Sequence, residues 1–252
     1  MRVVVCVKQI PDPASPYELD PKTHFLQRPN DQVLDDTDRY GLEMGLQLAE
    51  KTEGSVILVS MGPAGNLQGI RQALAMGADR AIVIDDPELR GADSLTTARV
   101  LSAAIGREGF DAVIAGTEST DGYTGVVPQQ IAELLGVPAL SFAKKVELDG
   151  GKIRIERQTD YGYDIVEAPT PVVITVTSGV VEPRYPTFKG IMAAKAKPID
   201  QVTAGDLGVT ATAGQEIVAV RPAPERAAGE VIEDDGDAHV RIIQLLEQAK
   251  VI

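Results

Sequence analysis

The loop at residues 116–125 has the composition of a phosphate-binding cradle. It reads Gly-Thr-Glu-Ser-Thr-Asp-Gly-Tyr-Thr-Gly and joins an apolar segment to a helical pattern. Small residues let backbone N–H groups approach a ligand, and a helix N-terminus offers unpaired donors and a favourable dipole. Because the loop contains neither Lys nor Arg, we expect it to hold a phosphate without cleaving it. The alternative is an ordinary glycine-rich connection.

The spacing of the glycines argues against common nucleotide enzymes. The loop matches neither G-x-G-x-x-G nor G-x-x-x-x-G-K-[ST], which disfavours a dinucleotide-dependent dehydrogenase and a P-loop NTPase. An adenylate-transferring enzyme is disfavoured as well, since it needs phosphate-binding cations near the loop.

Polar and sulfur-containing residues occur at the ends of other predicted elements. An acidic run precedes the first helical pattern, where it either caps that helix or points toward an adenine or ribose. Two sulfur-containing residues stand in or after apolar segments, where a small buried side chain and an ordinary loop are the alternatives. These residues are Asp35, Asp36, Thr37 and Asp38 for the acidic run, and Cys6 and Met61 for the sulfur-containing pair.

The segment at residues 182–195 carries two aromatic residues between prolines, in a chain with only ten Tyr and Phe residues. Tyr185 and Phe188 have the character of protein-recognition anchors, because aromatic residues on loops dominate many binding interfaces. The alternative is a loop that turns both rings inward to cover the core.

The composition is that of an acidic globular protein that is poor in aromatic residues. The 252 residues carry a net charge of −13, and 4% are aromatic. Such a chain lacks the basic surface and stacking rings of nucleic-acid-binding proteins, so we expect no nucleic-acid partner. With one cysteine, Cys6, and two distant histidines, His24 and His239, we expect neither a metal site nor catalytic residues.

The sequence also predicts a cytoplasmic protein that does not itself span a membrane. One cysteine cannot form an intrachain disulfide. No apolar stretch approaches the roughly 20 residues of a membrane span. The sequence enters its first apolar segment without a charged-then-apolar leader.

Apolar strand patterns and helical patterns alternate through the first 140 residues. Continuous β-branched runs predict strands covered on both faces, and this alternation predicts a parallel sheet. Glycines at positions 77, 106 and 136 are placed to end helices. Strands are expected at residues 3–7, 56–60, 81–84 and 112–115, and helices at 39–51, 65–76, 94–105 and 125–135.

The pattern changes after residue 138. Residues 145–157 alternate in polarity around Asp149-Gly150-Gly151, which predicts a hairpin on the surface of the sheet. Residues 171–176 predict another buried strand, and 178–197 have a loop-like composition. No periodicity is found over 198–237, and 238–251 form an amphipathic pattern. We therefore divide the chain into a domain at 1–197 and an arm with a helix at 198–252 that contacts another chain.

Together these patterns predict an α/β fold. We expect a doubly wound, mostly parallel sheet of the Rossmann-like, adenine-nucleotide-binding type, with a surface hairpin and an extended C-terminal arm.

Five blocks of the sequence resemble the small (beta) subunit of electron-transfer flavoproteins. The segment Val181-Glu-Pro-Arg-Tyr-Pro-Thr-Phe-Lys-Gly-Ile-Met-Ala-Ala-Lys-Ala-Lys197 closely resembles that family's signature. The other blocks, in matching order, are Val5-Cys-Val-Lys-Gln9, Arg71-Gln-Ala-Leu-Ala-Met-Gly-Ala-Asp-Arg80, Ile155-Glu-Arg-Gln-Thr-Asp160 and Asp206-Leu-Gly-Val209. The likeness covers nearly the whole chain.

The resemblance implies a heterodimer in which the alpha subunit holds most of an FAD and this chain binds a structural AMP. The implied AMP contacts are Cys6, Asp35, Asp36, Thr37, Asp38, Met61, Gly116, Asp121, Gly122, Tyr123, Thr124, Gly125 and Val126. Partner recognition would use Glu182, Arg184, Tyr185, Phe188, Ile191, Met192 and Lys195. Phe188 stands where the family carries an aliphatic anchor.

The implied function is electron transfer from flavin dehydrogenases, such as acyl-CoA dehydrogenases in fatty acid β-oxidation, to a membrane quinone oxidoreductase. Family members that bifurcate electrons bind a second FAD in place of AMP. The sequence Thr-Asp-Gly-Tyr-Thr-Gly-Val-Val-Pro at 120–128 shares only the Asp-Gly-x-Thr core of their loop, which favours AMP. A stand-alone nucleotide-binding sensor of the stress-protein type is the alternative from another class.

Overall fold

The computed structural model describes residues 1–221, 229, 231–234 and 236–252. It comprises two compact units, Met1–Val218 and Ala219–Ile252. The predicted arm at 198–252 therefore lies partly outside the described residues, and each unit is considered by itself.

The first unit is built on a nine-stranded sheet in the order β11-β5-β4-β1-β6-β10-β7-β8-β9. Seven neighbouring strands run parallel, and β8 and β9 continue the sheet in antiparallel pairing. The strands are β1 Arg2–Cys6, β4 Ser55–Met61, β5 Arg80–Ile84, β6 Ala112–Gly116, β7 Ala139–Asp149, β8 Lys152–Thr159, β9 Gly162–Pro169, β10 Val172–Val176 and β11 Ile199–Val202. A separate two-stranded ribbon joins β2 Gln9–Ile10 to β3 Val33–Leu34.

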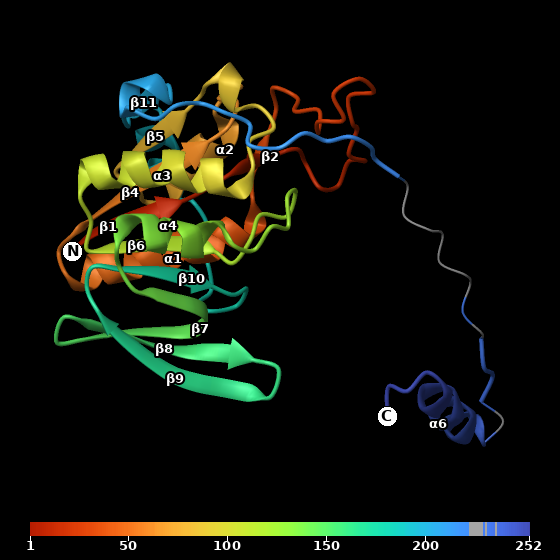
Figure 1. Ribbon diagram of the computed structural model, residues 1–252. Helices are drawn as coiled ribbons and strands as arrows, with labels where there is room; N and C mark the ends of the chain where they lie inside the picture. Colours follow the sequence, from red (N-terminus) through yellow and green to blue (C-terminus); the bar gives the residue numbers. More distant parts are fainter. Residues whose placement is uncertain (222–228, 230, 235) are drawn as a thin grey trace. The chain divides into compact units, whose positions relative to one another are not determined.

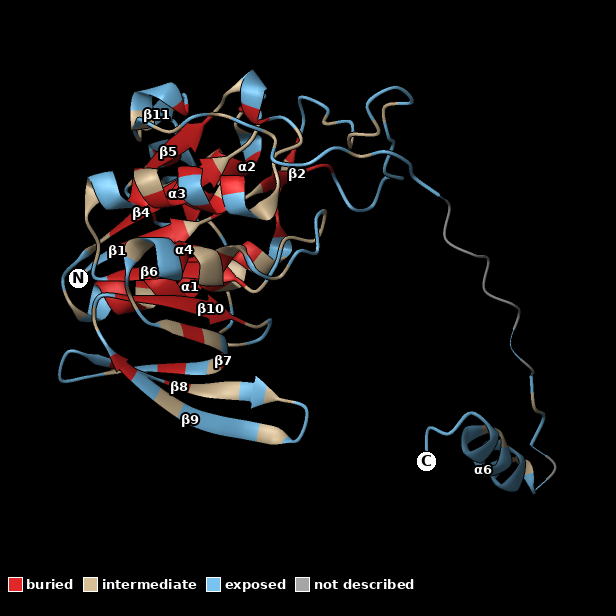
Figure 2. Cartoon of the chain, in the orientation of Figure 1, coloured by how far each residue is buried: buried red, intermediate tan, exposed pale blue. Residues whose placement is uncertain are grey.

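Helices cover both faces of the sheet (Figure 1). Leu42 and Leu74 pack with one set of strand side chains, and Leu101 and Ile131 pack with the other. The strands at the centre are almost wholly buried, whereas β9 is largely exposed (Figure 2). The helices are α1 Asp36–Lys51, α2 Gln68–Met76, α3 Ser94–Glu108, α4 Val127–Leu135, α5 Phe188–Ala194 and α6 Ala238–Gln248, with short 3-10 turns at Pro87–Leu89 and Gly205–Leu207.

This architecture confirms the predicted α/β class and the mostly parallel sheet. Helices α1 and α2 lie in the crossovers that lead from β1 to β4 and from β4 to β5, and they pack on one face of the sheet. Helices α3 and α4 lie in the crossovers from β5 to β6 and from β6 to β7, and they pack on the other face. The strand order consequently reverses between β1 and β6. Ligands of such sheets bind outside the carboxyl ends of the strands at this reversal.

Several predicted boundaries are wrong. The hairpin at 145–157 does not lie on the sheet surface, because β7 and β8 pair edge to edge within the sheet and β9 adds a third strand. Helix α3 continues past Gly106 to Glu108 and ends at Gly109. The loop-like stretch at 178–197 contains α5, whose N-cap Thr187 accepts a hydrogen bond from the Gly190 N–H at 3.0 Å.

The predicted domain boundary at residue 197 also needs correction. Strand β11 lies beyond it and pairs with β5, and contacts within the first unit continue to Val218. The apolar residues of β11 are its two terminal residues, Ile199 and Val202, and both are only partly buried at the sheet edge. The strand therefore has no clear apolar pattern in the sequence. No helix among the described residues is both long and apolar enough to cross a bilayer.

Candidate functional site

The ends of β1 and β6 bring Cys6, the acidic run at 35–38 and the 116–125 loop together. Val5 of β1 pairs with Ile114 of β6, so Cys6 and Gly116 end neighbouring strands. A Cβ atom placed on Gly116 would lie 3.2 Å from both Asp38 Oδ1 and Thr37 Oγ1. The start of α1 is therefore packed directly against the start of the 116–125 loop.

Asp35 joins α1 to this loop. Its fully buried carboxylate accepts hydrogen bonds from the Thr37 N–H and hydroxyl at 3.1 and 2.9 Å, and from the Thr120 N–H and hydroxyl at 2.8 and 3.1 Å. The first pair caps α1, and the second pair fixes the loop. With four protein partners, Asp35 positions the site and fills the capping role that the sequence left open.

Burial raises the pKa values of both Asp38 and Cys6. For Asp38 the charge of Asp35 acts in the same direction, while the Lys8 N–H, which donates to Asp38 Oδ2 at 2.6 Å, acts against it. Burial and the adjacent Asp38 raise the pKa of Cys6 to about 12. The two groups therefore form a buried polar patch at the end of β1.

Two cations reach the loop from elsewhere in the chain. Lys8 Nζ contacts Asp121 Oδ1 at 2.6 Å and Ser119 Oγ at 3.3 Å, and the Arg28 guanidinium contacts Asp121 Oδ2 at 2.5 Å. The expectation that no cations lie near residues 116–125 is therefore wrong. The single carboxylate of Asp121 pairs with both of them, so they tie the loop to the residues after β1 and to the excursion between β2 and β3.

Asp121 gives a pH-dependent prediction. Burial opposes its ionisation, but Lys8 and Arg28 outweigh burial and hold its pKa below the usual range. The resulting stabilisation is present above the unfolded-state pKa of about 3.9 and is lost as the pH falls through the lower folded-state pKa. We expect Asp121→Asn to lower the free energy of unfolding by about 1–2 kcal/mol at pH 7, because both cations retain access to water.

Chemical denaturation at several pH values tests this prediction. The difference between the two proteins should shrink as the pH falls below about 4. Asp20→Asn is the matched control, since the Asp20 carboxylate accepts hydrogen bonds from the neighbouring Lys22 and Thr23 N–H groups and not from Lys8 or Arg28. A difference that stays constant down to pH 2 would rule out the proposed role of the ion pairs.

The rest of the loop leads into an open helix end. Gly125 has a φ of +65°, and Val126, the N-cap of α4, contributes no side-chain hydrogen bond. The Tyr123 ring is 69% exposed, and Gly122 and Thr124 are exposed as well. The N-terminus of α4 thus has no side-chain cap, and of its first residues Pro128 carries no N–H group.

The remaining predicted ligand residues differ in position. Met61 ends β4 beside β1 and packs with Cys6 against the same core cluster. Asp36, in contrast, has an 82% exposed side chain that pairs with Arg39 at 3.5 Å. The structure therefore brings together every predicted element of the cradle but turns Asp36 away from it.

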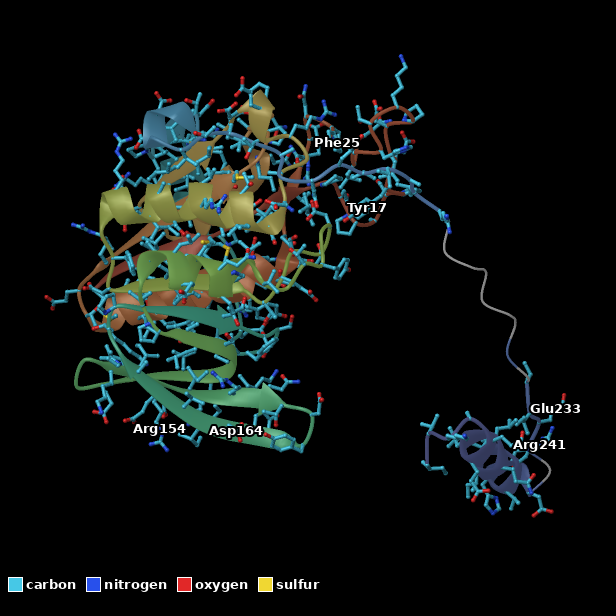
Figure 3. All side chains as sticks on the ribbon, in the orientation of Figure 1. Tyr17, Phe25, Arg154, Asp164, Glu233 and Arg241 are labelled. Atoms are coloured by element: carbon cyan, nitrogen blue, oxygen red, sulfur yellow. The ribbon has the colours of Figure 1, made fainter. Side chains whose placement is uncertain are left out.

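Two residues near the site, Arg28 and Tyr17, were not predicted from the sequence. Both lie on the excursion between β2 and β3, which also carries Phe25 (Figure 3). The pKa of Tyr17 is raised by burial and by the charges of Asp121 and Asp35. The excursion has no periodic pattern from which Arg28 or Tyr17 could be placed.

The predicted recognition segment exposes its aromatic residues. Tyr185 is 79% and Phe188 is 80% exposed. Ile191 and Met192 add 47% and 50% exposed side chains from α5, and Glu182 and Lys195 are exposed at the two ends. Arg184 differs from these residues, because its guanidinium turns inward to Glu43 and Glu50 of α1. The alternative in which both rings cover the core is wrong.

The described residues contain no group of three His, Cys, Asp or Glu side chains arranged to hold a metal ion. The site therefore consists of a polar cradle at the reversal of the sheet and a separate exposed apolar segment around α5.

Comparisons with known proteins define the class of this fold and site. Residues 23–207 match the Electron transfer flavoprotein domain family. The chain is 42% identical to the electron transfer flavoprotein subunit beta of Mycobacterium tuberculosis, with 99% of each chain covered. It is 33% identical to the corresponding subunit of Megasphaera elsdenii over the whole of both chains. It is also 34% identical to the caffeyl-CoA reductase-Etf complex subunit CarD of Acetobacterium woodii, over 83% of this chain and 81% of the relative.

The chain therefore belongs to the electron transfer flavoprotein family, and the relatives that it matches over its full length are beta subunits. It is a subunit of an electron carrier rather than an enzyme, because these relatives are named for electron transfer.

Proposed function

We propose that this chain pairs with an electron transfer flavoprotein alpha subunit in the cytoplasm and carries electrons between enzymes. FAD held mainly by the alpha subunit supplies the redox chemistry, while this chain supplies binding and orientation. The electrons come from flavin dehydrogenases, such as acyl-CoA dehydrogenases of fatty acid β-oxidation, and pass to a quinone oxidoreductase. The name of the Acetobacterium woodii relative, which includes a CoA-ester reductase, supports a donor or acceptor of that class.

The cradle between β1 and β6 is proposed to hold AMP as a structural ligand. The carrying observation is the N-terminus of α4, which has no side-chain cap and follows Gly125. Backbone N–H groups at this end suit the phosphate. The buried Asp38 carboxyl and the end of β1 suit the nucleoside part, and Asp35 holds the loop in place through its hydrogen bond from the Thr120 N–H. These residues fit AMP without a catalytic group near its phosphate.

Gly125→Ala tests the cradle. A side chain at a φ of +65° is strained by about 1–2 kcal/mol, and its Cβ would lie 3.3 Å from Glu118 Oε2. We expect the purified complex to lose AMP, with about ten-fold weaker rebinding, while its FAD content stays the same. Isothermal titration of AMP into nucleotide-stripped complex measures the change.

Gly150→Ala is the matched control for this substitution. Gly150 has a φ of +54° in the turn between β7 and β8, and nothing lies within 4 Å of an added Cβ. This variant should carry similar strain and bind AMP normally. Equal loss of AMP in both variants would contradict a phosphate site at Gly125. Retention of a second FAD in place of AMP would instead favour the bifurcating type.

The C-terminal helix is proposed to pack on the alpha subunit. Val240, Ile243 and Leu246 lie on one side of α6 and are 43%, 45% and 36% exposed, so the helix presents an apolar stripe that the described residues of its unit leave partly uncovered. We expect the chain to aggregate when expressed alone and to be soluble when co-expressed with the alpha subunit. A well-behaved monomer or homodimer that binds nucleotide would favour the stand-alone sensor instead.

The exposed segment at 182–195 is proposed to dock the partner dehydrogenase. Phe188, Ile191 and Met192 form an apolar anchor group on α5, and anchors of this kind provide most of the binding energy of protein interfaces. Because Arg184 is engaged within the chain, it is proposed to support the segment rather than to contact the partner.

A further inference from the structure

The docking helix α5 is too short to be stable without support. It spans seven residues, and its side chains are exposed apart from that of Ala194. Isolated helices shorter than about 12–15 residues are marginal in water, and most helical stability in proteins comes from packing. The conformation of α5 must therefore be imposed by the residues on either side of it.

The first support precedes α5 and is built on α1. The Arg184 guanidinium donates to Glu43 Oε2 at 2.7 Å and Oε1 at 3.0 Å, and to Glu50 Oε1 at 2.6 Å and Oε2 at 3.2 Å. The Arg184 backbone N–H adds a bond to Glu43 at 3.2 Å. The Glu43 side chain is 4% exposed, and Arg184 holds its pKa below the usual value against the effect of burial. A guanidinium fork shared by two carboxylates fixes orientation as well as position.

The same surface of α1 supports the neighbouring ring. Arg39 lies one turn before Glu43, and its guanidinium stands 5.7 Å from the centre of the Tyr185 ring. Arg39 thus contacts the Tyr185 ring through a cation–π interaction, while most of the Tyr185 side chain stays exposed.

The second support follows α5 and is built on α2. The Arg71 guanidinium donates to the carbonyl oxygens of Ala194 at 2.6 Å and Lys197 at 3.0 Å. In the opposite direction, Lys197 Nζ donates to three carbonyl oxygens at the end of α2, those of Leu74 at 3.1 Å, Gly77 at 3.3 Å and Ala78 at 2.6 Å. A cation at a helix C-terminus also favours the helix dipole.

Between the two supports, α5 touches the backbone of α2 directly. A Cβ atom on Gly190 would lie 2.5 Å from the carbonyl oxygen of Ala75. The first turn of α5 therefore rests on α2 at a distance that only glycine allows.

We propose that Arg184 with its two glutamates, and Arg71 with Lys197, are positioning residues that hold α5 in its docking conformation before a partner arrives. This inference rests on the proposed docking role of residues 182–195. Ordering a segment upon binding weakens affinity, and holding it in advance removes that cost. The supports determine how well Phe188 is presented, and they touch neither the partner nor the flavin.

The test uses the complete heterodimer and two variants, Arg184→Met and Lys197→Met. Each keeps an unbranched stem and removes the hydrogen bonds that the side chain of the substituted residue donates. We expect each variant to raise the KM of an acyl-CoA dehydrogenase for the complex about ten-fold, with the maximal rate at saturation and the flavin content unchanged. Amide hydrogen exchange in residues 188–194 should become faster in the free complex. Arg184→Lys, which keeps the charge but not the fork, should fall between Arg184→Met and the unmodified protein.

Arg154→Met is the matched control, because Arg154 is exposed on β8 and projects from the antiparallel part of the sheet (Figure 3). It should change neither the KM nor the exchange rate.

The outcomes separate this inference from the docking proposal. If Phe188→Ala raises the KM while Arg184→Met and Lys197→Met leave both the KM and the exchange rate unchanged, the positioning role is wrong. If Phe188→Ala itself changes nothing, the docking proposal is wrong. If Arg184→Met destabilises the whole chain, Lys197→Met and the exchange of residues 188–194 decide the matter, since they report on the second support and on α5 alone.

Discussion

Replacing Phe188 with alanine is expected to raise the KM of the electron-donating dehydrogenase for the complex about thirty-fold. Phe188 is 80% exposed at the start of α5, so its ring does not pack in the core of this chain. Truncating a central interface anchor typically costs about 2 kcal/mol or more, which corresponds to a factor of about thirty in affinity. Because the ring is exposed and does not pack in the core, flavin content and thermal stability should not change.

Steady-state kinetics with the complex as the varied substrate measures this effect. Tyr161→Ala is a matched control, since Tyr161 is 84% exposed in the turn between β8 and β9. These strands lie at the opposite end of the sheet order from β11, the strand that follows α5. We expect its kinetics to be those of the unmodified complex. Loss of flavin from the Phe188→Ala variant would instead mean that the segment supports the fold.

Replacing Asp35 with alanine is expected to lower the free energy of unfolding by about 3 kcal/mol. The substitution removes the N-cap of α1, which contributes about 1 kcal/mol. It also leaves the partly buried Thr120 N–H and hydroxyl without their acceptor, at a further cost of about 1–3 kcal/mol. In a chain of this size the melting temperature should fall by roughly 6–12 °C. The freed loop should also lose AMP.

Two further variants make the Asp35 prediction specific. Asp36→Ala changes the next residue, whose side chain is 82% exposed, and should have little effect on melting or nucleotide content. Asp35→Asn keeps a good capping residue and should retain part of the stability. Calorimetry and nucleotide analysis of the three complexes provide the measurements. Equal melting temperatures for Asp35→Ala and Asp36→Ala would contradict the role assigned to Asp35.

The fold was predictable where the apolar pattern of an element itself carries the information. The runs that form β1, β4, β6 and β10 are buried on both faces and are rich in β-branched residues, so their sequence leaves few alternatives. By contrast, α5 and β11 lie at edges, where contacts with α2 and β5 rather than their own apolar pattern stabilise them. Apolar periodicity in the sequence therefore does not predict such elements.

The candidate site was predictable to the extent that the strand ends determine it. Cys6 and Gly116 follow from the rule that parallel strands present their carboxyl ends at one edge. The ion pairs of Asp121 with Lys8 and Arg28 could not be predicted, because they join residues more than 90 positions apart. The inward turn of Arg184 depends in the same way on Glu43, which lies 141 positions away.

Nucleotide analysis of the co-expressed heterodimer tests the central claim most directly. Acid release followed by chromatography gives the amounts of FAD and AMP for each complex. We predict one FAD and one AMP per heterodimer, with AMP lost selectively from the Gly125→Ala variant. Two FAD molecules and no AMP, or a complex without flavin, would contradict the account.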